Sequence, residues 1–222
     1  MGLKASLISF FILVVIALLL WYRNANFDRA LAIFAFTLAS LQLIEYGIYN
    51  HANPEQSGNA IFIVLWLQCL MVIIAVFVYN KVANSQCQFK EDKHKLVELV
   101  AGFSLLLYSL VFIVALFIVY TGQGGFSANV SADGQSTEWT SKAGSILGNF
   151  TWLYIVGLFL PFILLLAFYS WSSLAIGLFI LYGVVSAIYV LNTYPMAVFG
   201  SKWSMLAIGV VFLAYMVNIN SC

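Results

Sequence analysis

The chain has 222 residues, of which 64% are hydrophobic and only 8% are charged, and its mean hydropathy is +1.01. This composition excludes a soluble globular protein and predicts a polytopic integral membrane protein. The formal net charge of +1 gives no indication of nucleic-acid binding. We expect one transmembrane domain over residues 1–222, surrounded by the lipid bilayer, with no room for a separate soluble domain.

Seven apolar runs are long enough to cross a bilayer as helices, which takes roughly 18–25 residues. In chain order they are Ala5–Tyr22, Phe27–Asn50, Ala60–Asn80, Leu96–Tyr120, Leu147–Phe168, Ser172–Asn192 and Trp203–Asn218. Aromatic residues gather at their ends, as in the interfacial belt of spanning helices. The sequence therefore predicts an all-α, seven-transmembrane-helix bundle.

The first run is followed by Trp21, Tyr22 and Arg23 rather than by small residues. It is therefore read as a retained helix and not as a cleaved signal peptide. One contrary signal on orientation lies at the N-terminus, where Met1–Ser6 matches the myristoylation pattern, because a myristoylated tail would be cytoplasmic.

The second run carries the most informative residue of the chain, Glu45. A carboxyl group in hydrocarbon costs several kcal/mol, so such a residue usually faces a partner or a water-filled cavity. Gln42 lies one turn earlier on the same face and Tyr49 lies one turn later. We therefore take Glu45, Gln42 and Tyr49 as candidate transport or binding residues.

The third run is antiparallel to the second and carries Gln68 near its middle. Counting from the helix ends places Gln68 and Glu45 at similar depths, which predicts a hydrogen bond between them. Two interpretations stay open. In the structural one, Gln42, Glu45 and Gln68 hold the second and third helices together, with Glu45 protonated. In the functional one, Glu45 binds a proton or cation and lines a path, with Gln68 as a further candidate.

The fourth run leads into the longest polar stretch of the chain, Thr121–Lys142, which we expect to be a loop rather than part of a core. Two acceptor sequences for N-linked glycans lie in or beside it, Asn129-Val-Ser and Asn149-Phe-Thr. They are typical of a segment outside the cell or in an organelle lumen. Asn149 lies close to the membrane.

The fifth run is interrupted by Pro161, which frees the carbonyl of Gly157 and predicts a kink. The kink is either static or a gate, so Pro161 is a gate candidate. The sixth run resembles the second: Leu174–Tyr189 aligns without gaps on Leu31–Tyr46. This alignment suggests a parallel repeat of three helices, one linker helix and three helices, with Ile188 at the position of Glu45.

Lysine and arginine residues indicate the orientation of the bundle. Six lie in the odd-numbered connections, and three lie in the N-terminal tail and the even-numbered connections. The first group is Arg23, Arg29, Lys81, Lys90, Lys93 and Lys95; the second is Lys4, Lys142 and Lys202. Because basic residues are enriched on the cytoplasmic side, the N-terminus is predicted outside and the C-terminus in the cytoplasm.

The side chains for several kinds of chemistry are missing. Only two histidines and three scattered cysteines are present, which gives no ligand cluster for haem, di-iron or zinc. No nucleophile elbow or phosphate-binding loop occurs. Lys202, at the start of the seventh run, is badly placed to bind retinal. We therefore expect no metal, no cofactor and no enzymatic activity.

The leading functional interpretation is a small transporter or channel for a proton, a cation or a small solute, with Glu45 as the ionisable centre. The alternative is a seven-helix sensor or receptor-like protein without transport, or a subunit of a larger membrane complex. A homo-oligomer is compatible with either function. We expect the protein to lie in the plasma membrane or in an endomembrane.

Four short segments also carry a family resemblance: Leu41–Tyr46, Leu67–Leu70, Asp133–Trp139 and Phe199–Trp203. Taken together and in order, they resemble an uncharacterised family of small polytopic membrane proteins found in giant-virus and protist genomes. The family has a proline after the glutamine of the third helix, where this chain has Cys69. The resemblance groups Gln42, Glu45, Gln68, Gly200 and Trp203 as one set, and it implies no activity.

Overall fold

The computed structural model describes residues 3–24, 28–82, 91–121, 126–132, 134–141, 156–157, 160, 174–194 and 198–217, and most of them are helical. The helices are α1 (Leu3–Arg23), α2 (Asp28–Tyr49), α3 (Pro54–Val82), α4 (Glu91–Tyr120), α6 (Leu174–Thr193) and α7 (Phe199–Val217). Within the described residues, four helices are long and apolar enough to span a membrane, in α1, α2, α3 and α4. The chain is therefore a membrane protein.

The predicted fifth helix, Leu147–Phe168, falls almost entirely outside the described residues, and so does its gate candidate Pro161. Seven crossings therefore remain a prediction. The described apolar part of α6, Ile180–Thr193, is shorter than the length taken for a span.

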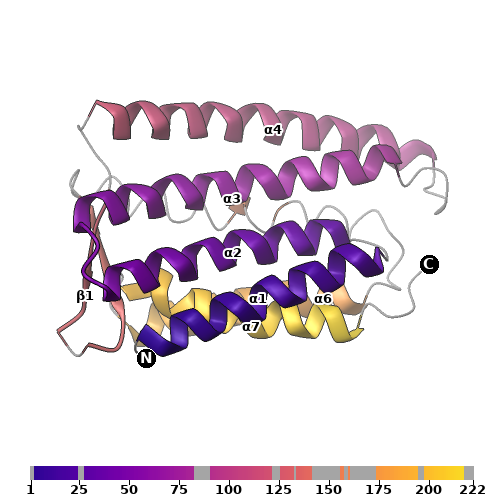
Figure 1. Ribbon diagram of the computed structural model, residues 1–222. Coiled ribbons are helices and arrows are strands. Elements are labelled where there is room, and N and C mark those ends of the chain that lie inside the picture. Colours follow the sequence, from indigo (N-terminus) through magenta and orange to yellow (C-terminus); the bar gives the residue numbers. More distant parts are fainter. Residues whose placement is uncertain are drawn as a thin grey trace.

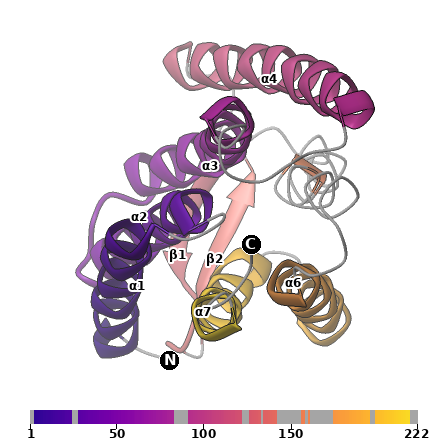
Figure 2. The same cartoon turned by 90° about the vertical axis from the view of Figure 1, so that its right-hand side faces the viewer.

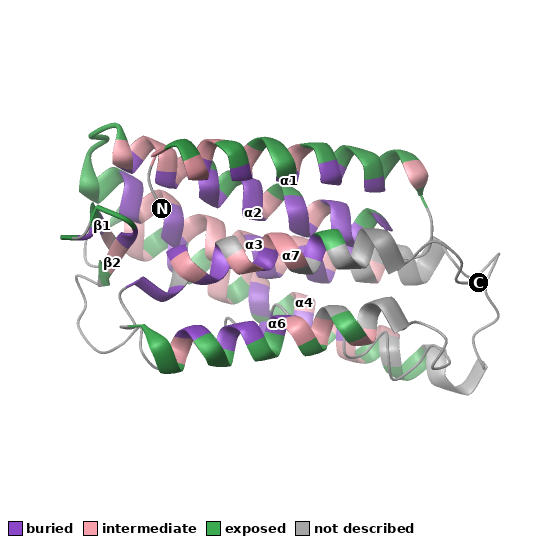
Figure 3. Cartoon of the chain, turned by 90° about the horizontal axis from the view of Figure 1, so that it is seen from below, coloured by how far each residue is buried: buried purple, intermediate pink, exposed green. Residues whose placement is uncertain are grey.

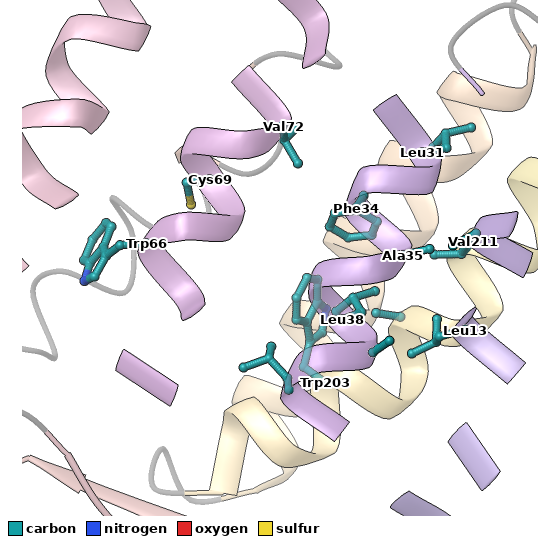
Figure 4. Packing of buried hydrophobic residues seen from close by; sticks show 14 of the residues in the cluster. Leu13, Leu31, Phe34, Ala35, Leu38, Trp66, Cys69, Val72, Trp203 and Val211 are labelled. Carbon is teal, nitrogen blue, oxygen red and sulfur yellow. The ribbon is translucent and has the colours of Figure 1, made fainter. Parts of the chain in front are cut away.

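The helices lie side by side along one axis (Figure 1). Seen from the end, α4, α3, α2 and α1 follow one another in an arc, α7 lies beside α2, and α6 lies beside α7 (Figure 2). The core lies where α2 meets its neighbours. Phe34, Ala35 and Leu38 of α2 are at most 1% exposed. Ala35 lies beside Val211 of α7, and Leu38 lies beside Trp203 of the same helix (Figure 4).

The outer faces of the bundle are apolar. In α1, Ile8, Phe11 and Val15 are more than half exposed, and Figure 3 shows the exposed residues running along the outward face of that helix. In α4, Leu99 and Phe103 are also more than half exposed. Continuous apolar faces of this length are suited to contact with lipid rather than with water.

Two short strands lie across one end of the bundle (Figure 1). Strands β1 (Phe126–Val130) and β2 (Thr137–Ser141) pair antiparallel, from Phe126 opposite Ser141 to Val130 opposite Thr137. The expectations of an all-α fold and of a plain loop over Thr121–Lys142 are therefore wrong at this hairpin. The end of the bundle that holds the hairpin, Tyr49 and Tyr120 is called the hairpin end below.

The turn of the hairpin satisfies its own polar groups, which explains why a polar segment adopts a fixed shape. The Ser131 hydroxyl donates to the carbonyl of Ser136 over 2.8 Å and accepts from the Ser136 N–H over 3.1 Å. Gly134 has a φ of +67°, which glycine adopts without steric cost. β1 packs on α3 and β2 on α7, so the hairpin is held between two helices of the bundle.

Helix α3 begins earlier than the apolar run predicts, because its first turn is polar. The side chain of Asn53 accepts hydrogen bonds from the N–H groups of Glu55 and Gln56 at 2.9 and 3.2 Å, as an N-cap does. Pro54 occupies the first helical position, where a missing N–H is harmless. This start moves every later residue of α3 deeper into the bundle than counting from Ala60 suggests.

Helices α2 and α6 bury different faces, although their letters align. Glu45 is 1% exposed and its aligned partner Ile188 is 50% exposed. Gln42 is fully buried, whereas Val185 at the matching position is 55% exposed. Because the fifth helix is not among the described residues, the three-plus-one-plus-three repeat remains a prediction, and the burial pattern does not support it.

Candidate functional site

The carboxyl group of Glu45 is enclosed at the hairpin end of the bundle. It is 1% exposed, so it faces protein rather than lipid, as predicted. Thr137 Oγ1 of β2 donates a hydrogen bond to Glu45 Oε1 over 3.2 Å. The Ser201 side chain in the first turn of α7 also hydrogen-bonds the carboxyl group, and the charge of Lys202 acts on it. Three elements, α2, β2 and α7, therefore meet at one carboxyl group.

The direction of the hydrogen bond from Thr137 follows from its neighbour Trp139. The indole Nε1–H of Trp139 lies 2.9 Å from Thr137 Oγ1 and can only donate. Thr137 Oγ1 thus accepts from the indole and directs its own proton at Glu45. The two bonds form a chain in which each bond polarises the next.

Ser201 is oriented in the same way. Its Oγ lies 3.4 Å from the backbone N of Thr137, which can only donate. The hydroxyl proton of Ser201 is then available for the carboxyl group of Glu45. Two hydroxyl donors, from Thr137 and Ser201, converge on this group, and both oxygens come from residues that are at most 3% exposed.

Gln42 makes the next contact between α2 and α7, one turn deeper. Its Nε2 donates to Ser204 Oγ over 2.8 Å, and Ser204 Oγ donates to the carbonyl of Ser201 over 3.0 Å. Within the described part of the chain, Gln42 Oε1 is buried and has no hydrogen-bond partner. Gln42 and Glu45 are three residues apart on α2, as Ser201 and Ser204 are on α7, so each of these two α2 residues meets one serine of the facing helix.

Gln68 lies elsewhere. The described groups that bind the Glu45 carboxyl are those of Thr137 and Ser201, so the predicted Glu45–Gln68 pair is not formed. The early start of α3 is the reason: Pro54 to Gln68 spans about 21 Å of helix, whereas Glu45 to Tyr49 spans only about 6 Å. The two helix ends are adjacent, since Ala52 N–H donates to the Gly47 carbonyl over 3.0 Å. Gln68 is fully buried at this deeper level.

The other candidates stand as follows. Tyr49 is the last residue of α2 and is half-buried. Trp203 donates from Nε1 to Ser186 Oγ of α6 over 3.2 Å, so it joins α7 to α6. Gly200 lies in the first turn of α7, next to Ser201.

Sequence reasoning missed Thr137, Ser201 and Ser204. Thr137 lies in a polar stretch, and the two serines lie at the start of an apolar run, so neither place suggests a buried site. One expectation from the sequence bears on these residues, the resemblance over four segments. Three of its four segments, Leu41–Tyr46, Asp133–Trp139 and Phe199–Trp203, supply residues that meet at this site.

Comparison with known protein families, curated proteins and solved structures found no match to this chain. Across the residues that the structure describes, no three His, Cys, Asp or Glu side chains come together as a metal-binding group. The site is instead one carboxyl group, three hydroxyls and one amide. Oxygen atoms of these kinds can bind a proton or a hard cation, for which oxygen is the preferred ligand.

Proposed function

We propose that this protein is a small integral membrane transporter or channel for a proton, a cation or a small solute, with Glu45 as its ionisable centre. The observation that carries the proposal is the hydrogen bond from Thr137 of the hairpin to Glu45 of a spanning helix. A segment at the end of the bundle thereby contacts the most costly group to bury. In this arrangement the hairpin closes the path to Glu45 from the hairpin end.

We further propose seven crossings with the hairpin end outside the cytoplasm. The lysine and arginine count supports this orientation. The directions of the described helices support the number of crossings. α4 ends at the hairpin end with Tyr120, and α6 runs back towards that end (Figure 1). An odd number of crossings before α6 fits these directions.

The proposed cycle uses the residues of the site in a fixed order. When the hairpin moves away, Glu45 loses the Thr137 hydroxyl and meets water from the hairpin end. The carboxyl group then exchanges its proton or cation. When the hairpin returns, the hydroxyls of Thr137 and Ser201 again satisfy Glu45 and exclude water. Release to the other side requires a path past the deeper level, where Gln68 and Tyr108 are buried.

Reconstituted vesicles test this function. Wild-type protein should support a proton flux, or a sodium or potassium flux, when a pH or cation gradient is imposed. Glu45→Gln keeps the shape of the side chain but cannot carry a proton or a charge, so the flux should disappear. Ser40→Ala is the matched control, because Ser40 lies on the exposed face of the same helix and its hydroxyl donates to the Phe36 carbonyl one turn earlier. Glu45→Gln protein that is folded and still conducts would contradict the proposal.

A second function is favoured by the same contact. The hairpin bridges Glu45 of α2 and Ser201 at the start of α7, so a ligand or subunit that binds the hairpin would act on both helices directly. This is the arrangement of a sensor, or of a subunit in a larger membrane complex. It predicts wild-type vesicles that are silent to protons, sodium and potassium, and a Glu45→Gln variant with nearly unchanged stability.

A further inference from the structure

The outward face of the hairpin carries an acceptor sequence for an N-linked glycan. Asn129, Val130 and Ser131 form the pattern Asn-X-Ser at the end of β1. Successive residues of a strand point to opposite sides. Ala128 is fully buried against the bundle, so Asn129 points away from it and is exposed. A bulky glycan on this side chain would not displace any packed group.

We infer that Asn129 is a site of N-linked glycosylation. The glycan is attached on the luminal side of the membrane, to which the hairpin end is exposed during synthesis. The inference rests on the proposed orientation, with the hairpin outside the cytoplasm, and not on transport. The donor is a lipid-linked oligosaccharyl diphosphate. Asn129 Nδ2 forms a bond to the anomeric carbon of the sugar and loses one proton to the transferase. The bond from that carbon to the diphosphate oxygen breaks, and the lipid diphosphate leaves.

The hydrogen bonds of Ser131 also lead us to expect transfer at an early stage. The third residue of the acceptor sequence, Ser131, is 8% exposed. Its hydroxyl is engaged with Ser136 through the carbonyl at 2.8 Å and through the backbone N–H at 3.1 Å. A transferase that recognises this hydroxyl therefore finds it only before the turn closes. The glycan is added during synthesis, before the hairpin of residues 126–141 has formed.

The hairpin retains its function after transfer, because its two faces do different work. The inner face supplies Thr137 to Glu45, and the outer face supplies Asn129. In the hairpin, Asn129 lies opposite Glu138, which is also not buried. A glycan at Asn129 therefore leaves the contact with the bundle intact, and vesicle flux should not depend on it.

The test uses the full chain, produced in eukaryotic cells and carrying Asn149→Gln so that a single acceptor remains. Treatment with a glycosidase specific for N-linked glycans should shift the protein to a lower apparent mass. Asn129→Gln should abolish the shift completely. Ser131→Ala should do the same with Asn129 intact, whereas Ser131→Thr, which keeps the hydroxyl, should retain the shift. Pulse labelling should show the glycan on newly made chains and no further addition during a chase.

Two results would overturn the inference. One is a chain with Asn129 intact that shows no glycosidase-sensitive band. The other is a band whose shift survives Asn129→Gln. Flux is measured separately on the unglycosylated Asn129→Gln protein. A failure of the glycan is thereby distinguished from a failure of the transport proposal.

Discussion

Glu45 shows how a membrane protein stabilises an acidic side chain away from water. A buried carboxyl group is tolerated when its hydrogen-bonding capacity is satisfied and a countercharge is near. Here Thr137 and Ser201 supply the donors, and Lys202 follows Ser201 in the first turn of α7. Because Trp139 fixes the direction of the Thr137 hydroxyl, the whole group is preorganised rather than adaptable.

Thr137→Val tests this arrangement. The change removes the hydroxyl donor to Glu45 and leaves the Trp139 N–H without its acceptor, so stability should fall by about 1–2 kcal/mol. The loss of stability is measured by unfolding the protein in detergent with heat or denaturant. Thr137→Ser should retain most of the stability, and Ser40→Ala on the exposed face of α2 should change little. If the Thr137→Val protein were as stable as the wild type, the hydrogen bond would contribute nothing to stability.

Half of the site could be read from the sequence, and half could not. Glu45 and Gln42 are identified by local spacing, because residues three apart on a helix share a face and both are polar in an apolar run. Their partners are not local. Thr137 is 92 residues from Glu45, and Ser204 is 162 residues from Gln42. No periodic pattern encodes which distant hydroxyl meets which carboxyl group, so the predicted partner Gln68 was wrong.

At the scale of elements, composition predicted the helices better than their ends. The four clearest spans were found because apolar length alone identifies them. The start of α3 was missed because Asn53, Pro54 and Glu55 are polar or helix-capping residues that a hydropathy count ignores. The hairpin was missed because its strands are short, and packing on α3 and α7 stabilises it more than its own composition does.

The end of α2 offers a stabilising change. His51 has a φ of +62° and follows the last turn as the left-handed residue of a Schellman motif, in which its N–H donates to the Ile48 carbonyl over 3.1 Å. Glycine adopts this conformation without the steric cost of a Cβ, so His51→Gly should raise stability by about 1 kcal/mol. Thermal unfolding in detergent measures the gain. His51→Val should destabilise, and a stabilised valine variant would contradict the explanation.

A substitution at Gly157 should destabilise the protein. A Cβ at this position would collide with the ring of Tyr108, which is 2% exposed in α4. Gly157→Ala should therefore lower stability by about 1–3 kcal/mol through overpacking. Gly102→Ala is the control, because nothing lies within 4 Å of its added Cβ and alanine favours a helix by up to about 1 kcal/mol. Equal effects of the two changes on unfolding temperature would exclude the close packing of Tyr108.

At the scale of the whole molecule, the bundle has two chemically different ends. One end carries the hairpin and the site at Glu45. The other holds Arg23 and Asp28, whose side chains form a double hydrogen bond at 2.7 and 2.8 Å between α1 and α2. Asp28 also lies in the first turn of α2, where a negative charge is favoured by the helix dipole.

Orientation is tested by cysteine labelling. In a chain whose own cysteines are replaced by alanine, Ala132→Cys at the exposed turn of the hairpin should react with an impermeant maleimide in intact cells or right-side-out vesicles. Lys95→Cys, at the start of α4, should react only after permeabilisation. Labelling of position 95 in sealed membranes would contradict the proposed topology. It would also contradict the glycan at Asn129, which depends on that topology.

The long separation between Gln42 and its partner also sets a waiting time during biosynthesis. Ser204 follows Gln42 by 162 residues, which a ribosome takes roughly 8–30 seconds to add at about 5–20 residues per second. For that interval α2 has left the ribosome while the hydroxyls of α7 do not yet exist. During that interval Gln42 lacks the hydroxyl that it binds in the finished protein, whereas Thr137, the donor to Glu45, is made earlier. A chain stopped before Ser201 would lack the hydroxyls of both Ser201 and Ser204, and Thr137 would be the remaining donor to Glu45.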